Sequence, residues 1–119
     1  MKDNIIRNKS FDFSVRIINL YKILISERKE NIMSKQLLRS GTSIGANIEE
    51  GIAAFSAKEF VVKFQISYKE AFETLYWLKL LHKTKYINDL EFNSLHKDIE
   101  EIIKILASIL KTTKQKITK

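Results

Sequence analysis

Residues that form turns are almost absent from this chain of 119 residues. It contains no proline and only three glycines, all of which lie between residues 39 and 51. Folds built from many short strands need many such residues, because proline and glycine are the strongest turn signals. The scarcity therefore favours a few long helices with short connections, and the length predicts one domain, 1–119, with a single core.

The spacing of apolar residues predicts four helices, at about 10–27, 32–54, 57–83 and 89–113, followed by a basic tail at 111–119. Two of the starts carry a capping-box pair three residues apart, Ser56 with Glu59 and Asn88 with Glu91. Each pair is bracketed by apolar residues at the positions of a hydrophobic staple: Phe55 and Phe60, and Ile87 and Phe92. Helices joined so closely predict an all-α, antiparallel up-down-up-down four-helix bundle.

The glycine-containing stretch RSGTSIGANIEEG, residues 39–51, raises the question of a phosphate-binding loop. It lacks the Gly-Lys-[Ser/Thr] ending of such a loop and follows a helical pattern instead of a strand. As a helix, it places Gly41 and Gly45 on the same arc as Ile44 and Ile48. Two interior glycines cost roughly 1–2 kcal/mol of helix propensity. We therefore expect them to permit the close approach of another helix.

The opposite side of the same helix is a stripe of short polar residues, bounded by an arginine and a glutamate. Its members are Arg39, Ser43, Asn47 and Glu50. One interpretation is a solvated face. The other is a buried hydrogen-bonded network that pairs with Glu70 or Glu73 of the 57–83 helix, because buried carboxylates need partners. Both a network within one subunit and one between subunits fit this pattern.

The 57–83 helix is apolar on two sides. One arc holds Phe60, Phe64, Tyr68, Ala71, Leu75 and Leu78, and the other holds Val62, Ile66, Trp77 and Leu80. A bundle helix needs one apolar stripe. The second arc indicates either a wide core with some exposed aromatic residues or a homo-oligomer that packs through the 32–54 and 57–83 helices.

The net charge is +7, and the excess of lysine and arginine is spread along the chain. Such a charge permits binding to nucleic acid without requiring it. We find no motif that combines aromatic and basic residues for stacking, so we expect contacts to phosphate that do not depend on base sequence. The candidate contact residues are Lys63, Lys69, Lys79, Lys83, Lys111, Lys114 and Lys116.

Signatures of catalysis and of metal binding are missing from the sequence. The chain has no cysteine, and its two histidines, His82 and His96, form neither a His-x-x-x-His pair nor the Glu-x-x-His pattern of di-iron bundles. We therefore predict no catalytic, cofactor-binding or metal-binding residues. No stretch approaches the length of a membrane span or a signal peptide, which predicts a cytoplasmic protein that does not bind membranes.

Two linked motifs resemble the four-helix-bundle family of proteins encoded within intervening sequences of bacterial 23S rRNA genes. The first is LLRSGTSIGANIEEG, and the second is the run SAKEFVVKFQISYKEAFETLYWLKLL. The family positions fall on Arg39, Ser40, Ser43, Ile44, Asn47, Glu50, Gly51, Glu70, Ala71, Glu73, Thr74, Trp77 and Leu78.

This family is related to the accessory variability protein of diversity-generating retroelements, and the resemblance implies small bacterial bundles that assemble as homopentamers. Some relatives bind nucleic acid and a reverse transcriptase through a basic surface. The leading hypothesis is therefore a non-enzymatic, homo-oligomeric bundle, pentameric by this resemblance, that binds structured RNA or DNA through dispersed lysines. The alternative is an interaction scaffold that docks a partner enzyme without binding nucleic acid. We expect Arg39, Ser43, Asn47, Glu50, Glu70, Glu73 and Trp77 to govern assembly.

Overall fold

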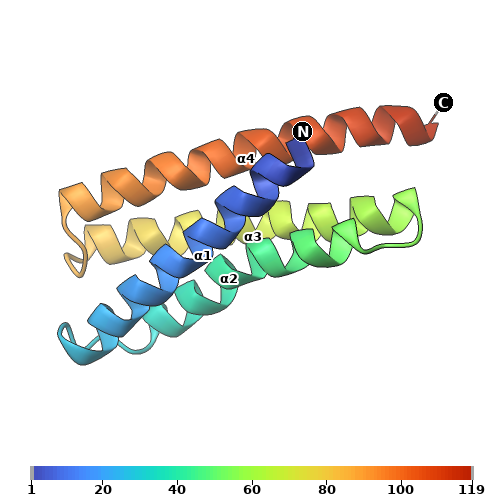
Figure 1. Ribbon diagram of the computed structural model, residues 1–119. Coiled ribbons are helices and arrows are strands. Elements are labelled where there is room, and N and C mark those ends of the chain that lie inside the picture. Colours follow the sequence, from blue (N-terminus) through green and yellow to red (C-terminus); the bar gives the residue numbers. More distant parts are fainter. Residues whose placement is uncertain (1, 119) are drawn as a thin grey trace.

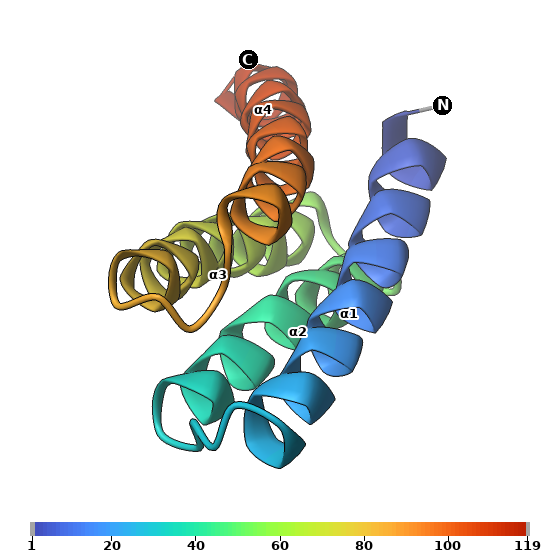
Figure 2. The same cartoon turned by 90° about the vertical axis from the view of Figure 1, so that its left-hand side faces the viewer.

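The computed structural model describes residues 2–118, and the side chains of residues 4–117. This part of the chain folds into four helices: α1 (Lys2–Ser26), α2 (Met33–Ile52), α3 (Ala57–Lys83) and α4 (Asp89–Thr118). Each helix packs against its neighbours in the chain, and α1 and α4 also contact each other (Figures 1 and 2). The molecule is therefore an all-α four-helix bundle, as the sequence predicts, with one elongated body of 51 × 21 × 20 Å.

The predicted capping boxes form at both helix starts. Ser56 Oγ accepts a hydrogen bond from the Glu59 amide at 3.1 Å. The Asn88 and Glu91 pair is reciprocal: the Glu91 amide donates to Asn88 Oδ1 at 2.8 Å, and the Asn88 amide donates to Glu91 Oε1 at 2.9 Å. The staple predicted before α3 is wrong, because Phe55 is fully exposed.

Two predicted helix boundaries are corrected by the structure. The first helix begins at Lys2 instead of residue 10, because Ile6 lies at helical spacing from Phe13 and is fully buried in the core. The last helix continues to Thr118 instead of ending near residue 113. Ile117 packs against the core and holds this end in place, while the lysines between are good helix formers. The predicted tail 111–119 is thus helical as far as Thr118, and Lys119 lies outside the described residues.

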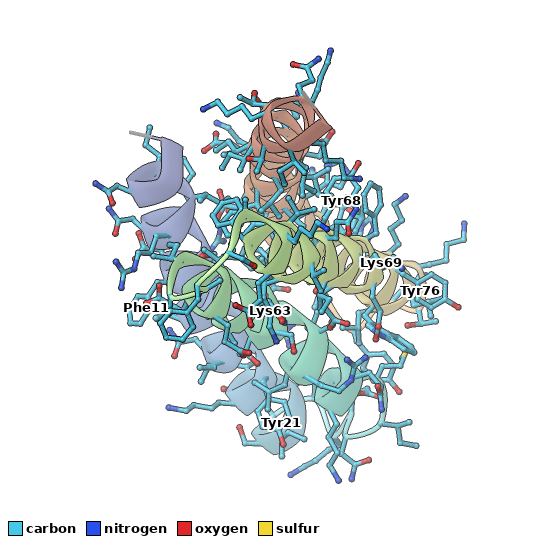
Figure 3. All side chains as sticks on the ribbon, turned by 90° about the vertical axis from the view of Figure 1, so that its right-hand side faces the viewer. Phe11, Tyr21, Lys63, Tyr68, Lys69 and Tyr76 are labelled. Carbon is cyan, nitrogen blue, oxygen red and sulfur yellow. The ribbon has the colours of Figure 1, made fainter. Side chains whose placement is uncertain are left out.

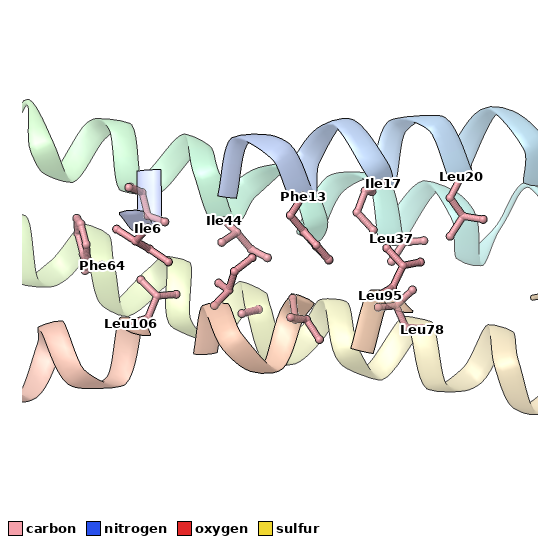
Figure 4. Close-up of a cluster of buried hydrophobic side chains, with 14 of the residues drawn as sticks. Ile6, Phe13, Ile17, Leu20, Leu37, Ile44, Phe64, Leu78, Leu95 and Leu106 are labelled. Atoms are coloured by element: carbon pink, nitrogen blue, oxygen red, sulfur yellow. The ribbon is translucent and has the colours of Figure 1, made fainter. Parts of the chain in front are cut away.

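The core runs along the bundle axis and receives side chains from all four helices (Figure 4). The apolar residues of α4 that recur every three or four positions are all buried: Leu95, Ile99, Ile102, Leu106 and Ile109. The arc predicted for α3 is shifted, because Phe60, Tyr68 and Leu75 are only partly buried. The buried stripe instead consists of Val61, Phe64, Ser67, Ala71, Thr74, Leu78 and Leu81.

Two small polar residues in the α3 stripe explain this shift. Ser67 Oγ donates to the Ile44 carbonyl at 2.8 Å, and Thr74 Oγ1 donates to Ser40 Oγ at 2.9 Å. Both side chains are fully buried, and they join α3 to α2. A helical wheel that counts only apolar residues cannot predict that Ser67 and Thr74 are buried, because hydroxyl groups are buried only where hydrogen-bond partners exist.

Gly41 of α2 allows α1 to approach closely, as predicted. A Cβ atom added to Gly41 would lie 2.9 Å from Ile17 Cγ2, which is too close for a real contact. At Gly45 the nearest atom is Ser10 Oγ, at an ordinary 3.4 Å. The helical interpretation of residues 39–51 is therefore correct, and the closest approach of α1 occurs at Gly41.

Candidate nucleic-acid interface

The outer surface of α3 has two flanks of opposite charge. Glu70 and Glu73 lie toward α2, because Arg39 of that helix contacts both. Lys69 instead lines a groove that α3 forms with α4. Figure 3 shows Tyr68, Lys69 and Tyr76 on the outer side of α3, while Lys63 lies toward α2. One helix therefore presents a carboxylate surface and a lysine surface at the same time.

Arg39 is the centre of the network on the α2 side. Its guanidinium contacts Glu70 Oε2 at 3.1 Å and also Glu73 Oε2, and its Nε donates to Gln36. Trp77 Nε1 donates to the same Glu73 oxygen at 3.0 Å. The Arg39 side chain remains about half exposed at 48%, compared with 18% for Glu70 and 34% for Glu73. The predicted contact between Arg39 and these glutamates is present within one chain, but it lies at the surface and is not buried.

The other members of the predicted polar stripe do not join this network. Ser43 Oγ donates to the Arg39 carbonyl and Asn47 Nδ2 donates to the Ser43 carbonyl, at 2.7 and 2.9 Å. Both bonds stay within α2, because short polar side chains readily reach the carbonyl four residues earlier. Glu50 instead pairs with Lys63 Nζ at 2.9 Å. Within one chain, the network with Glu70 and Glu73 therefore includes Arg39 and none of these three residues.

A basic groove of about 490 Å³ lies between α3 and α4. Lys69 contributes from α3, and Lys111 and Lys114 contribute from α4. No carboxylate lines it among the described residues. Its remaining lining is apolar or uncharged: Val62, Gln65, Ile66, Tyr68, Ala107 and Leu110. The α3–α4 groove thus concentrates positive charge from two helices over an apolar floor.

The other four candidate lysines lie outside this groove. Lys79 is exposed on α3, ten residues beyond Lys69, which corresponds to about 15 Å along the helix axis. Lys83 is one further turn away. Lys116 lies on a different side of α4 from Lys111, because five residues advance a helix by about 140° beyond a full turn. Lys63 is held by Glu50 on the opposite flank, so its charge is already matched.

Aromatic residues lie near the lysines on the outer side of α3 (Figure 3), which sequence reasoning missed. Tyr68 lines the groove, and its ring lies edge-on to Phe72, with centroids 5.1 Å apart. The side chains of Phe72 and Tyr76 are 48% and 55% exposed. The expectation that aromatic and basic residues do not combine is therefore corrected. The available signal was the four-residue spacing of Tyr68, Phe72 and Tyr76, which predicts one helix side.

A second groove, of about 660 Å³, lies between α1 and α2. Its floor includes Gly45 and Ala46, and Phe11 stands at its edge with 68% of its side chain exposed. An ion pair between Arg7 and Glu49 lies across these helices at 2.6 Å. This groove carries both signs of charge, unlike the α3–α4 groove.

Each of the two histidines contacts an aromatic ring and a carboxylate near the turn between α3 and α4. Both rings stack on Phe92, at centroid distances of 4.3 Å for His82 and 5.3 Å for His96. Across the described residues, no three potential metal-ligating side chains come together. Within that same part of the chain, no helix combines the length and apolarity needed to cross a membrane.

Fold and surface together define a class of protein: a small helical bundle whose third helix separates an Arg39–glutamate network from a lysine-lined groove. Comparison with protein families gives a more specific result, since the description "23S rRNA-intervening sequence protein" matches residues 2–108. The chain belongs to this family.

A solved structure supports the fold independently. The chain is similar to a protein of the S23 ribosomal protein family from Bacteroides thetaiotaomicron, described as of unknown function and determined at 1.70 Å resolution. The two share 55% sequence identity and a TM-score of 0.92, over 93% of this chain and 99% of the other. A comparison with curated proteins finds no match.

Proposed function

We propose that this protein is a non-enzymatic, homo-oligomeric bundle that binds structured RNA or DNA through lysines of α3 and α4. The observation that carries the proposal is the α3–α4 groove, in which Lys69, Lys111 and Lys114 meet without a carboxylate in the described lining. Like charges brought together from two helices raise the local potential and attract phosphates. The family description, which refers to 23S rRNA, agrees with a polyanion of this kind.

Assembly in this proposal uses the other flank of α3. One chain leaves the network of Arg39, Glu70, Glu73 and the Trp77 ring half open. A second copy that covers this surface would shield both apolar area and charge-assisted hydrogen bonds. A ring of five copies is what the family resemblance implies. The network is formed with α2 and the lysine groove with α4, so a second copy and a nucleic acid would contact different neighbours of α3.

The experiment that tests binding compares two pairs of lysine substitutions with the same change in net charge. Lys69→Gln combined with Lys111→Gln removes two groove lysines, and Lys22→Gln combined with Lys35→Gln removes two exposed lysines from α1 and α2. Affinity for a fluorescent RNA hairpin and a DNA duplex is measured at low salt. We expect the groove pair to weaken binding by about tenfold or more, and the control pair to have a much smaller effect. If the two pairs of substitutions weaken binding equally, the α3–α4 groove is not the binding site.

A scaffold that docks a partner enzyme is the second candidate function, and the α1–α2 groove favours it. Exposed Phe11 beside a groove of about 660 Å³ is the kind of apolar surface that partner proteins cover. The two candidates differ in a simple result. If neither RNA nor DNA binds at low salt, the scaffold function replaces the nucleic-acid one.

A further inference from the structure

The outer side of α3 carries a row of aromatic rings that begins with Tyr68 at the groove and ends with Tyr76, whose ring lies edge-on to Trp77 at 5.1 Å (Figure 3). Tyr68, Phe72 and Tyr76 follow one another at four-residue intervals, so their attachment points are about 6 Å apart along the helix. Tyr68 lines the groove, whereas Phe72 and Tyr76 are about half exposed. Exposed aromatic rings in a regular row offer flat apolar faces to a ligand.

Lysines border this row of rings on both sides. Lys69 and Lys79 extend from α3, and Lys111 and Lys114 extend from α4 across the groove. A ligand that fits must therefore combine flat apolar groups with negative charges along its length. Single-stranded nucleic acid has this chemistry, because its bases stack on aromatic side chains while its phosphates contact lysines.

A duplex fits the same surface poorly. Its bases are paired and stacked inside the helix, so only phosphates would meet the protein, and the exposed faces of Phe72 and Tyr76 would have no base to stack on. Another copy of the same surface is also a poor partner, because its lysines would face these lysines across the apolar floor.

We propose that the outer side of α3, beside the α3–α4 groove, is a stacking site for single-stranded nucleic acid. Unpaired bases lie on Phe72 and Tyr76, and the phosphates between them contact Lys69 and Lys111. This inference rests on the proposed nucleic-acid function and narrows it: within a structured RNA or DNA, the site takes loops and unpaired ends instead of helical stems.

The test uses RNA and DNA single strands of about twelve nucleotides, a length within the usual site size. Each contains one 2-aminopurine, and each is compared with its own blunt duplex. The wild-type protein should bind the single strand more tightly than the duplex and quench the 2-aminopurine fluorescence by stacking. Tighter binding of either the RNA or the DNA strand than of its duplex supports the proposal.

Substitutions in the row of rings separate stacking from charge. Phe72→Ala and Tyr76→Leu should each weaken single-strand binding by roughly tenfold, while the affinity for the duplex changes little. Tyr76→Phe keeps a ring and should retain both affinity and quenching. Phe11→Ala removes a similarly exposed ring from α1 and should have no effect. Oligomer mass and far-UV circular dichroism, recorded for each variant, show that the fold is kept.

The results that overturn this inference differ from those that overturn the proposed function. Equal affinity for single strand and duplex, with no effect of Phe72→Ala or Tyr76→Leu, contradicts the stacking site. The proposed function survives that result if binding still depends on Lys69 and Lys111. Failure of all nucleic acids to bind contradicts both proposals, and in that case binding of an acidic amphipathic peptide would assign the groove to a protein partner.

Discussion

At Gly41 and Gly45, the methyl group that an alanine would add determines how closely α1 can approach α2. Gly41 faces the fully buried, β-branched Ile17, which has few rotamers into which it can move. Gly45 faces the smaller Ser10 at an ordinary contact distance. The sequence predicts that both glycines serve close packing, but it cannot rank them, because their difference depends on which α1 residue lies opposite.

A matched pair of alanine substitutions tests this difference. Gly41→Ala should lower the free energy of unfolding by about 1–2 kcal/mol, since the clash with Ile17 exceeds the gain in helix propensity. Gly45→Ala should raise it by about 0.5–1 kcal/mol, since the added methyl group fits and the helix gains. Urea denaturation measures both values. Stabilisation by both substitutions would mean that α1 does not approach α2 at Gly41.

Glu30 caps the start of α2, although it lies before the first helical residue. Its carboxylate accepts hydrogen bonds from the amides of Ile32, Met33 and Ser34 at 3.2, 2.9 and 2.7 Å. Burial of the side chain opposes its ionisation, but these hydrogen bonds outweigh burial and lower the pKa of Glu30 below its usual value. Apolar spacing placed the start of α2 within one residue, but no capping box precedes this helix, so residue types did not identify Glu30 as its cap.

The lowered pKa makes stability depend on pH in a defined direction. A carboxyl group with a lower pKa in the folded state stabilises the fold above its unfolded pKa of about 4.3, and this contribution is lost as pH falls through the folded pKa. Glu30→Gln should therefore lower the free energy of unfolding by about 1–2 kcal/mol at neutral pH and by less in acid. Glu27→Gln, at an exposed position, is the control. A deficit for Glu30→Gln that stays constant down to pH 3 would contradict this assignment.

Helix ends were predictable to different degrees. Both bounds of α3 and the start of α4 were predicted correctly. Local capping pairs at Ser56 and Asn88 mark the two starts. The start of α1 and the end of α4 were wrong, because they are held by tertiary packing of Ile6 and Ile117 instead of by a cap. For the same reason the sequence located the α3 lysines but not the groove, whose second side comes from α4.

A partly buried ion pair connects the turn after α1 to the start of α4. Arg28 donates from two nitrogens to both Glu91 oxygens, at 2.9 and 2.7 Å, and their side chains are 30% and 26% exposed. The hydrogen bonds from Arg28 are the largest cause of a lowered pKa at Glu91. This geometry resists solvent screening better than the more exposed pair of Arg16 and Asp98.

A double-mutant cycle should detect the difference between these two ion pairs. We expect a coupling free energy of about 1 kcal/mol between Arg28→Ala and Glu91→Gln. The equivalent cycle with Arg16→Ala and Asp98→Asn should give less than about 0.5 kcal/mol. Chemical denaturation of the four single and two double variants supplies the values. Equal coupling in both cycles would show that burial at the α1–α4 contact adds nothing.

At the scale of the whole molecule, α3 divides the surface into two parts with different proposed roles. The flank toward α2 carries the Arg39 network, and the flank toward α4 carries lysines and Tyr68, at which the row of aromatic rings begins. The sequence suggested both sets of residues, but it did not show that one helix keeps them apart. This separation follows from the register of α3 against its two neighbours.

Substitutions on only one flank of α3 should change the oligomer mass. Arg39→Ala and Trp77→Ala remove the centre and the edge of the network, so we expect each to lower the oligomer mass measured by sedimentation at micromolar concentration. Phe72→Ala, in the row of aromatic rings, should leave the mass unchanged. An unchanged oligomer in the first two variants, or dissociation by Phe72→Ala, would place the subunit interface elsewhere.

The most direct test of the central claim is the salt dependence of nucleic-acid binding by the intact oligomer. We predict that the logarithm of affinity for a single-stranded RNA falls linearly with the logarithm of salt concentration. The slope for the protein with Lys69→Gln and Lys111→Gln should be shallower by about 0.7 for each phosphate that a site no longer neutralises. The slope for the protein with Lys22→Gln and Lys35→Gln should match the wild type. Identical slopes for all three proteins, or no binding at the lowest salt, would contradict the claim that the α3–α4 groove binds nucleic acid.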